Sequence, residues 1–146
     1  NIESGKWLEG SYLNDGSFDY IGILVDGKVH WYPIDPNTLS QFTGKTTCKG
    51  NELFENDIVF DEIAEDHGDH RIYYVCKWIP EWSKFVFLDY GELIQYEDNG
   101  LDKEYGLEDD GTFGLEDSEK MHYAGNIIDD YNLIVMGDDY KKINNE

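Results

Sequence analysis

The chain of 146 residues is strongly acidic, because 32 Asp and Glu stand against 11 Lys and Arg and leave a formal net charge of −21. Phosphate backbones and anionic membrane surfaces are bound through clusters of Lys and Arg, so this charge argues against both as direct partners. Hydrophobic residues make up 40% of the chain and aromatic residues 15%, enough to bury a core, and the length predicts a single domain over residues 1–146.

Short segments of alternating polarity, separated by turn residues, recur along the chain and predict a mainly β fold with little helix. Asp26-Gly27 predicts a type I′ hairpin turn between two of them, and Pro33 and Pro36 end that hairpin in a connector with one short helical turn. The predicted segments are, in chain order, 7–13, 20–25, 29–32, 58–60, 72–78, 84–88, 93–96, 121–128 and 133–136. This spacing favours a small antiparallel barrel, SH3-like, or a highly bent sheet.

No apolar run approaches about 18 residues, so the sequence predicts no membrane span. The chain has two cysteines, Cys48 and Cys76, too few for a disulfide framework or a zinc site. We expect both to be reduced thiols in a cytosol.

The most ordered pattern of the sequence lies within residues 41–59. Gln41-Phe42-Thr43-Gly44 is followed by a turn at Lys49-Gly50, and Glu55-Asn56-Asp57 then leads into Ile58-Val59. The apolar residues are separated by turn formers, so the chain must double back to bury them. We expect Phe42 and Phe54 to be buried, Gly44 and Gly50 to lie in turns, and Ile58-Val59 to lie in a central strand. Asp57 is expected to accept backbone hydrogen bonds within its turn, which is a structural role.

This pattern resembles the signature of the YopX family of phage and prophage proteins, and three further elements follow the family in the same order. They are Lys6-Trp7-Leu8-Glu9-Gly10-Ser11-Tyr12-Leu13, Tyr32-Pro33-Ile34-Asp35-Pro36-Asn37-Thr38 and Ala124-Gly125-Asn126-Ile127-Ile128-Asp129. Asn56 departs from the family's usual Gly, Thr47 from a frequent Asp and Lys45 from a frequent Leu. The chain begins at Asn1 without the strand that usually opens family members, which suggests a trimmed N-terminus.

The resemblance implies a phage context and hence the cytoplasm of a bacterial host cell. The resemblance implies no reaction and no catalytic residue, because no reaction is established for the family and no catalytic residues are known in it. No G-x-S-x-G elbow, P-loop or H-E-x-x-H pattern occurs in the sequence, so we expect a protein that is not an enzyme and has no cofactor. The two histidines of Asp66-His67-Gly68-Asp69-His70 are metal-ligand types, but without a further strong ligand nearby the segment is expected to be a solvated acidic loop.

Residues 97–120 form an acidic segment that we interpret as an insertion in the domain. It contains a short repeat, in which Tyr105-Gly106-Leu107-Glu108-Asp109 recurs as Phe113-Gly114-Leu115-Glu116-Asp117. One interpretation is an exposed insertion held to the domain by its apolar residues, and the other is a binding appendage.

The charge leads to a functional hypothesis. Duplex DNA carries one charge per about 1.7 Å of axis, so −21 corresponds to about 36 Å, close to the diameter of a compact chain of this length. We therefore expect a non-enzymatic phage protein that mimics nucleic acid and inhibits a basic, nucleic-acid-binding host protein, as an anti-defence or anti-CRISPR factor does. The expected contact residues are Glu97, Asp98, Asp102, Glu104, Glu108, Asp109, Asp110, Glu116 and Asp117.

The alternative is a module that binds a small ligand or a peptide in an aromatic groove, with the charge serving solubility alone. The aromatic residues that would line the groove are Trp31, Tyr32, Tyr73, Tyr74, Trp78, Trp82, Phe85 and Phe87. Because a charge of −21 opposes self-association, we expect a monomer or a small oligomer under either hypothesis.

Overall fold

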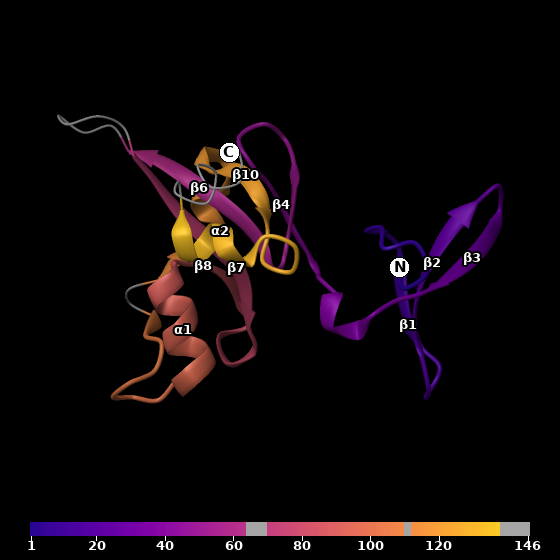
Figure 1. The fold of residues 1–146 in the computed structure, drawn as a ribbon, viewed down its shortest axis with the longest axis horizontal. Helices are drawn as coiled ribbons and strands as arrows, with labels where there is room; N and C mark the ends of the chain where they lie inside the picture. The colour runs from indigo at the N-terminus through magenta and orange to yellow at the C-terminus, as the bar shows by residue number, and fades with distance from the viewer. Residues whose placement is uncertain (64–69, 110–111, 138–146) are drawn as a thin grey trace. The chain divides into compact units, whose positions relative to one another are not determined.

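A computed structural model describes residues 1–63, 70–109 and 112–137, and the chain divides into two compact units, Asn1–Leu39 and Ser40–Glu146 (Figure 1). The sequence predicts one domain over residues 1–146 and does not anticipate this division. Each unit is described below by itself.

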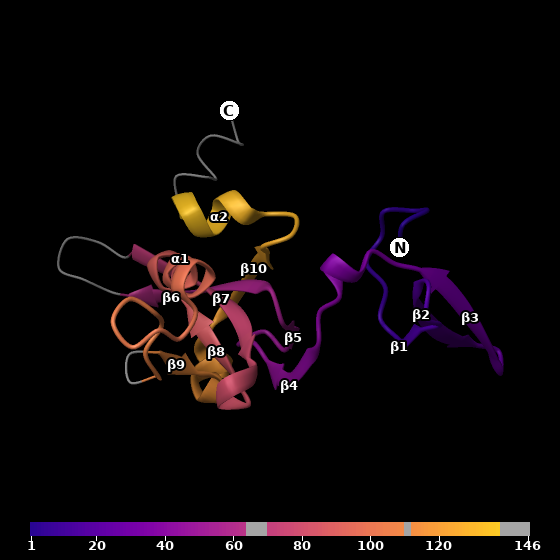
Figure 2. The ribbon, with the colours of Figure 1, turned by 90° about the horizontal axis from the view of Figure 1, so that it is seen from below.

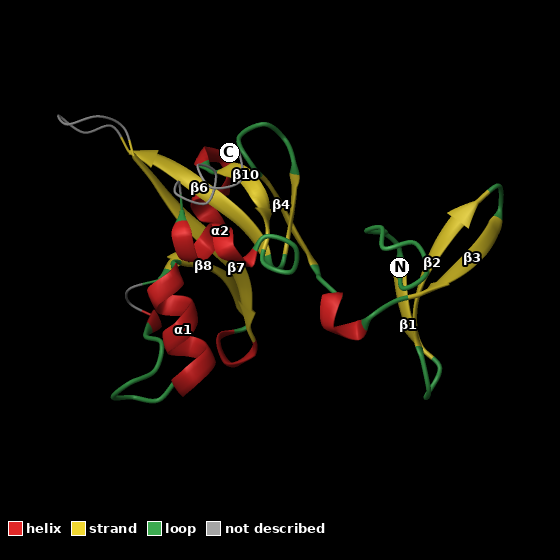
Figure 3. Ribbon diagram, in the orientation of Figure 1, coloured by secondary structure: helices red, strands yellow, loops and turns green. Residues whose placement is uncertain are grey.

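The first unit is an antiparallel sheet of three strands, in the order β1-β2-β3 (Figure 3). The strands are β1 (Ser11–Asn14), β2 (Asp19–Val25) and β3 (Lys28–Pro33), and the 3-10 turn η1 (Pro36–Thr38) follows them. Asp26 and Gly27 have φ of 50° and 78°, the positive values that a type I′ turn needs at both central positions. The predicted hairpin is therefore confirmed, whereas the first strand begins at Ser11 rather than at Trp7.

The second unit is built on an antiparallel sheet of five strands in the order β10-β6-β7-β8-β9. These strands are β6 (Asp57–Ile63), β7 (His70–Ile79), β8 (Lys84–Leu88), β9 (Phe113–Gly114) and β10 (His122–Asn126). A separate ribbon pairs β4 (Phe42–Thr46) with β5 (Glu52–Phe54), and η2 (Pro80–Trp82) joins β7 to β8.

Both faces of the five-stranded sheet are covered, and its inner strands present apolar side chains to both, with successive residues pointing to opposite faces. Two helices, α1 (Tyr90–Asn99) and α2 (Tyr131–Met136), bury Leu93, Leu133 and Ile134 against one face. On the other face, Leu53 of β5 and Leu115 of η4 (Leu115–Lys120) pack around Phe87. Figure 2 shows α2 on one side of the sheet and β4 on the other.

The mainly β, antiparallel fold agrees with the prediction, but the described residues contain no closed barrel. Layers on both faces cover the strands of this open sheet. Two predicted β segments are also wrong: residues 93–96 lie in α1, and residues 133–136 lie in α2. In α1 the side chain of Asp89 accepts from the backbone N–H of Glu92 and the side chain of Glu92 accepts from that of Asp89, a capping box that favours a helix over a strand.

The pattern over residues 41–59 folds partly as expected. Ile58 and Val59 are fully buried in β6, which has a strand on each side. Phe42, however, is 46% exposed and Phe54 is only half-buried, their rings in contact at 5.3 Å, because Leu53 takes the core position instead. The N–H of Gly50 closes a turn on the carbonyl of Thr47, while Gly44 lies inside β4, at an irregularity where its φ is 82°.

Candidate functional site

The acidic segment, residues 97–120, is part of the fold of the second unit rather than a loose insertion. Leu107 is buried in the core beneath α1, and its N–H donates to the carbonyl of Gly100 over 2.8 Å. Gln95 of α1 donates to the carbonyl of Gly106 over 2.8 Å, and β9 adds an edge strand to β8. The segment is therefore held by core packing and by a sheet pairing.

The short repeat has the same orientation in both copies. The leucines point inward, Leu107 into the core on the helix side and Leu115 against the core on the other side. The aromatic residues are more exposed, Tyr105 at 63% and Phe113 at 50%, but the ring of Phe113 meets that of Tyr74 edge-on with centroids 5.8 Å apart. The interpretation of apolar residues that hold the segment thus applies to the two leucines and to Phe113.

The predicted contact residues are spread along this segment. Glu97 and Asp98 lie in the last turn of α1, Asp102 and Glu104 lie in the turn after it, Glu108 and Asp109 precede β9, and Glu116 and Asp117 lie in η4. Asp110 lies outside the described residues.

Three of these carboxylates have structural partners. Asp102 accepts the backbone N–H groups of Glu104 and Tyr105 over 3.0 and 3.1 Å, and these bonds lower the pKa of Asp102. Asp109 forms an ion pair with Lys84, and Asp117 forms one with Lys120 at 3.4 Å. These three side chains help to fix the path of the segment.

The other five described carboxylates are exposed and form no hydrogen bond or ion pair with any part of the chain that the structure describes. They are Glu97, Asp98, Glu104, Glu108 and Glu116. Their charges are therefore available to a partner, on a backbone that the buried Leu107, the partly buried Leu115 and the pairing of β9 hold in place.

The turn at Glu55-Asn56-Asp57 joins β5 to β6 and makes many internal bonds. Asn56, at φ 74°, donates its N–H to Cys76 over 2.7 Å and accepts the ammonium of Lys77 on its side-chain oxygen over 2.9 Å. Glu55 accepts the N–H of Trp78 over 3.1 Å. Every one of these contacts ties the turn to β7, which supports a structural role.

The aromatic residues of the alternative hypothesis do not share one surface. Trp31 and Tyr32 belong to the first unit. In the second unit Tyr73 is buried on the helix side of the sheet, whereas Tyr74 and Phe87 are buried on the opposite side. Trp78 packs against Phe85 with ring centroids 4.9 Å apart, and Trp82 packs against the helix-side core.

A close pair that the sequence does not reveal joins Cys48 to His122, with Sγ and Nδ1 3.3 Å apart. The N–H of Cys48 donates to the carbonyl of Met121 over 2.9 Å, and the His122 ring stacks on Phe60 with centroids 4.8 Å apart. The two residues are 74 positions apart in sequence, so no local motif could have indicated the contact.

The described residues contain no group of three or more His, Cys, Asp and Glu side chains that could hold a metal ion. Of the segment Asp66–His70, only His70 lies within the described part, in β7. Over the same described ranges, no helix has the length and apolarity needed to cross a membrane.

Comparisons of the chain with family models, with curated proteins and with solved structures give no match. The resemblance to the YopX family accordingly stays a prediction that rests on the motifs quoted above.

Proposed function

We propose that this chain is a non-enzymatic, phage-derived binding protein whose acidic surface engages a basic, nucleic-acid-binding protein of the host in the place of nucleic acid. On this proposal it inhibits its partner, as an anti-defence factor acting on a restriction, CRISPR or repair enzyme would. Its contact surface is the acidic segment, residues 97–120.

The observation that carries the proposal is the set of five exposed, unpaired carboxylates on a structured segment. Residues 97–120 contain ten Asp and Glu against two Lys, a formal charge of −8. A protein that replaces nucleic acid must present its charges at fixed positions, because charges on a freely moving tail lose conformational entropy on binding. The burial of Leu107 and the pairing of β9 with β8 hold those positions before a partner arrives.

The distribution of charge supports the same surface. The first unit has six Asp and Glu against two Lys, a net charge of −4, whereas the second unit has 26 against nine and a net charge of −17. A strongly negative surface attracts basic partners over about a Debye length and speeds their association. It equally repels nucleic acid, which fits a protein that competes with nucleic acid for the same partner.

The test is affinity capture from a host lysate at low salt, followed by elution in a salt gradient and by competition with duplex DNA. We expect a basic, nucleic-acid-binding protein that elutes early in the gradient and is displaced by DNA. Recovery of no such protein at low salt would overturn the proposal.

A matched pair of variants separates the site from the overall charge. The first replaces the five unpaired carboxylates by their amides: Glu97→Gln, Asp98→Asn, Glu104→Gln, Glu108→Gln and Glu116→Gln. The control removes five exposed carboxylates elsewhere: Glu3→Gln, Glu9→Gln, Asp26→Asn, Glu52→Gln and Glu81→Gln. Both variants lose five charges, and we expect the first alone to lose the partner.

A further inference from the structure

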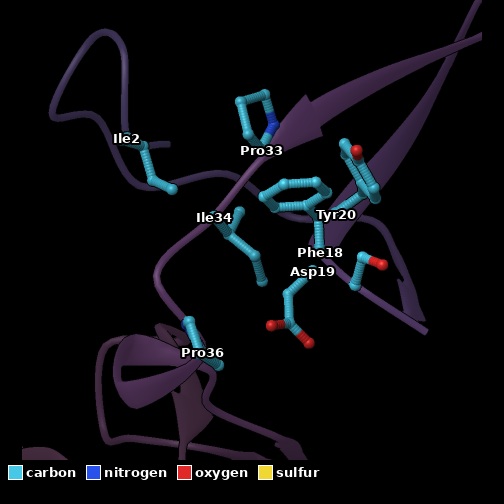
Figure 4. A pocket seen from close by; sticks show the side chains of 8 residues that line it. Ile2, Phe18, Asp19, Tyr20, Pro33, Ile34 and Pro36 are labelled. Atoms are coloured by element: carbon cyan, nitrogen blue, oxygen red, sulfur yellow. The ribbon is translucent and has the colours of Figure 1, made fainter. Parts of the chain in front are cut away.

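The first unit contains a hollow of about 300 Å³ where β2 begins and β3 ends (Figure 4). Its apolar lining comes from Ile2, Phe18, Tyr20, Pro33, Ile34 and Pro36, and its polar lining from Ser17 and Asp19. The volume lies at the lower end of the range of small-ligand sites, and it is large enough for one long side chain.

Backbone hydrogen bonds bring the separate parts of this hollow together. The N–H of Ile2 donates to the carbonyl of Pro33 over 3.0 Å, and the N–H of Ile34 donates to the backbone carbonyl of Asp19 over 3.0 Å. On the other side, the carboxylate of Asp15 accepts the N–H groups of Ser17 and Phe18 over 2.9 and 2.7 Å. The lining residues are therefore positioned without a ligand.

The charged group in the lining of the hollow is the carboxylate of Asp19. Its Oδ1 accepts the hydroxyl of Tyr12 over 2.6 Å and the amide of Asn14 over 2.9 Å. These bonds, that of Tyr12 first, lower the pKa of Asp19, so the carboxylate is ionised at neutral pH. Its Oδ2 accepts no hydrogen bond from the residues that the structure describes, and Figure 4 shows the Ile34 side chain extending toward the side chain of Asp19.

We propose that this hollow binds an arginine side chain of a basic partner, with the guanidinium on Oδ2 of Asp19 and the methylene groups against the apolar lining. The inference deepens the proposed function and rests on it, since it adds a second contact to the same class of partner. An acidic ligand is disfavoured by the ionised carboxylate, and a wholly apolar ligand would desolvate Oδ2 of that carboxylate without donating a hydrogen bond to it.

Arginine fits this lining better than lysine. The guanidinium is planar and more weakly hydrated than an ammonium, and it stacks on aromatic rings. Phe18 supplies such a ring, because its side chain is 64% exposed at the rim of the hollow. Lysine would have to give up more hydration to reach the same carboxylate.

The experiment is an NMR titration of the full chain with N-acetyl-arginine methylamide at neutral pH and low salt. We expect chemical-shift changes at Phe18, Asp19, Tyr20 and Ile34, with an affinity on the order of 1 mM for a ligand of this size. The citrulline analogue has nearly the same shape without the charge and should bind at least tenfold more weakly, and the lysine analogue should fall between the two. Equal affinities for the arginine and citrulline probes, or changes confined to residues 97–120, would overturn the inference.

Two variants and a control test the residues. Asp19→Asn keeps an acceptor for Tyr12 and Asn14 but removes the charge, and Phe18→Ala removes an exposed ring that the fold does not need. Each substitution should weaken the binding of the arginine probe at least fivefold. Asp26→Asn removes a carboxylate at the opposite end of β2, in a turn position that Asn tolerates, and should bind as the unaltered chain does.

This titration also separates the inference from the proposed function. If the five-carboxylate variant binds the arginine probe normally while no partner is captured from lysate, the proposed function fails and the hollow is still an arginine site. If a partner is captured but neither Asp19→Asn nor Phe18→Ala affects the probe or the partner, the hollow is not the site and the proposed function stands.

Discussion

The Oδ2 atom of Asp57 accepts the backbone N–H of Phe54 over 2.8 Å and thereby closes the turn between β5 and β6. Asp57 is 8% exposed, and the burial of its carboxylate raises its pKa to about 6, an effect that the bond from Phe54 partly offsets. The hydrogen bond that the sequence predicts at this turn is therefore present, and the side chain is also an acid that titrates near neutral pH.

Asp57→Ala should lower the free energy of unfolding by about 1–2 kcal/mol at pH 5, because it leaves the partly buried N–H of Phe54 without its acceptor. At pH 7 the loss should be smaller, since the same substitution also removes a buried charge. Chemical denaturation at the two pH values measures both. Partner binding of the folded variant should be unchanged, and lost binding with unchanged stability would show that the turn is a functional site.

The pH dependence of stability follows from the raised pKa of Asp57. The folded state holds this proton more tightly than the unfolded chain does, so the contribution is complete below pH 4 and is lost as the pH rises through about 6. With an ordinary value near 3.8, the shift corresponds to at most about 3 kcal/mol. The stability of the unaltered chain relative to Asp57→Asn isolates this group, and it should fall by up to about 3 kcal/mol from pH 4 to pH 7.5. A difference that stays constant over this range would mean that Asp57 has an ordinary pKa.

Local sequence predicted the elements whose determinants are local. Asp26-Gly27 specifies the hairpin through two positive φ angles, and the nearly continuous apolar runs in residues 72–78 and 84–88 match strands that are buried on both faces. The sequence pattern does not predict the helix α1, although its capping box, Asp89 with Glu92, is readable in the sequence. Its apolar residues are too few to give a clear 3.6-residue period, and among the residues of α1 Leu93 alone is buried.

The candidate sites could be predicted only where composition indicates them. The acidic segment is visible as a run of carboxylates, but nothing local separates Asp102 and Asp109, which have structural partners, from the unpaired Glu97 and Glu104. The hollow in the first unit combines residues from four stretches between Ile2 and Pro36, none of which is a motif. Such a site depends on the register of β2 with β3, which local sequence patterns do not predict.

The capping box of α1 gives a prediction with an internal control. Asp89→Ala should lower the free energy of unfolding by about 1 kcal/mol, because the N–H of Glu92 loses its acceptor. Asp98→Ala removes a carboxylate near the other end of the same helix, where a negative charge opposes the helix dipole, and should be neutral or slightly stabilising. Thermal melts of both variants make the comparison, and equal losses would show that the capping box contributes nothing.

The five-carboxylate variant of the acidic segment should be as stable as the unaltered chain or more stable. None of its five side chains bonds to another part of the described chain, and their removal reduces repulsion within a segment of charge −8. Asp102→Ala is the contrasting substitution, since it removes the acceptor of two backbone N–H groups and should destabilise the turn after α1. Denaturation at low and high salt measures both, and any gain in the five-carboxylate variant should diminish at high salt.

The two cysteines should react very differently with a thiol reagent such as iodoacetamide. Cys48 is exposed beside His122, whereas Cys76 is fully buried in β7, where burial and the nearby Asp57 and Glu55 raise its thiol pKa. Since the thiolate is the reactive form, Cys48 should be alkylated in the native protein and Cys76 only after unfolding. Mass spectrometry of peptides from native and denatured samples distinguishes the two, with Cys48→Ser as the control that should leave the native protein unlabelled. Native labelling of Cys76 in that control would mean that the sheet opens around β7. The core that Cys76 shares with Leu53 and Phe87 would then be accessible to the reagent.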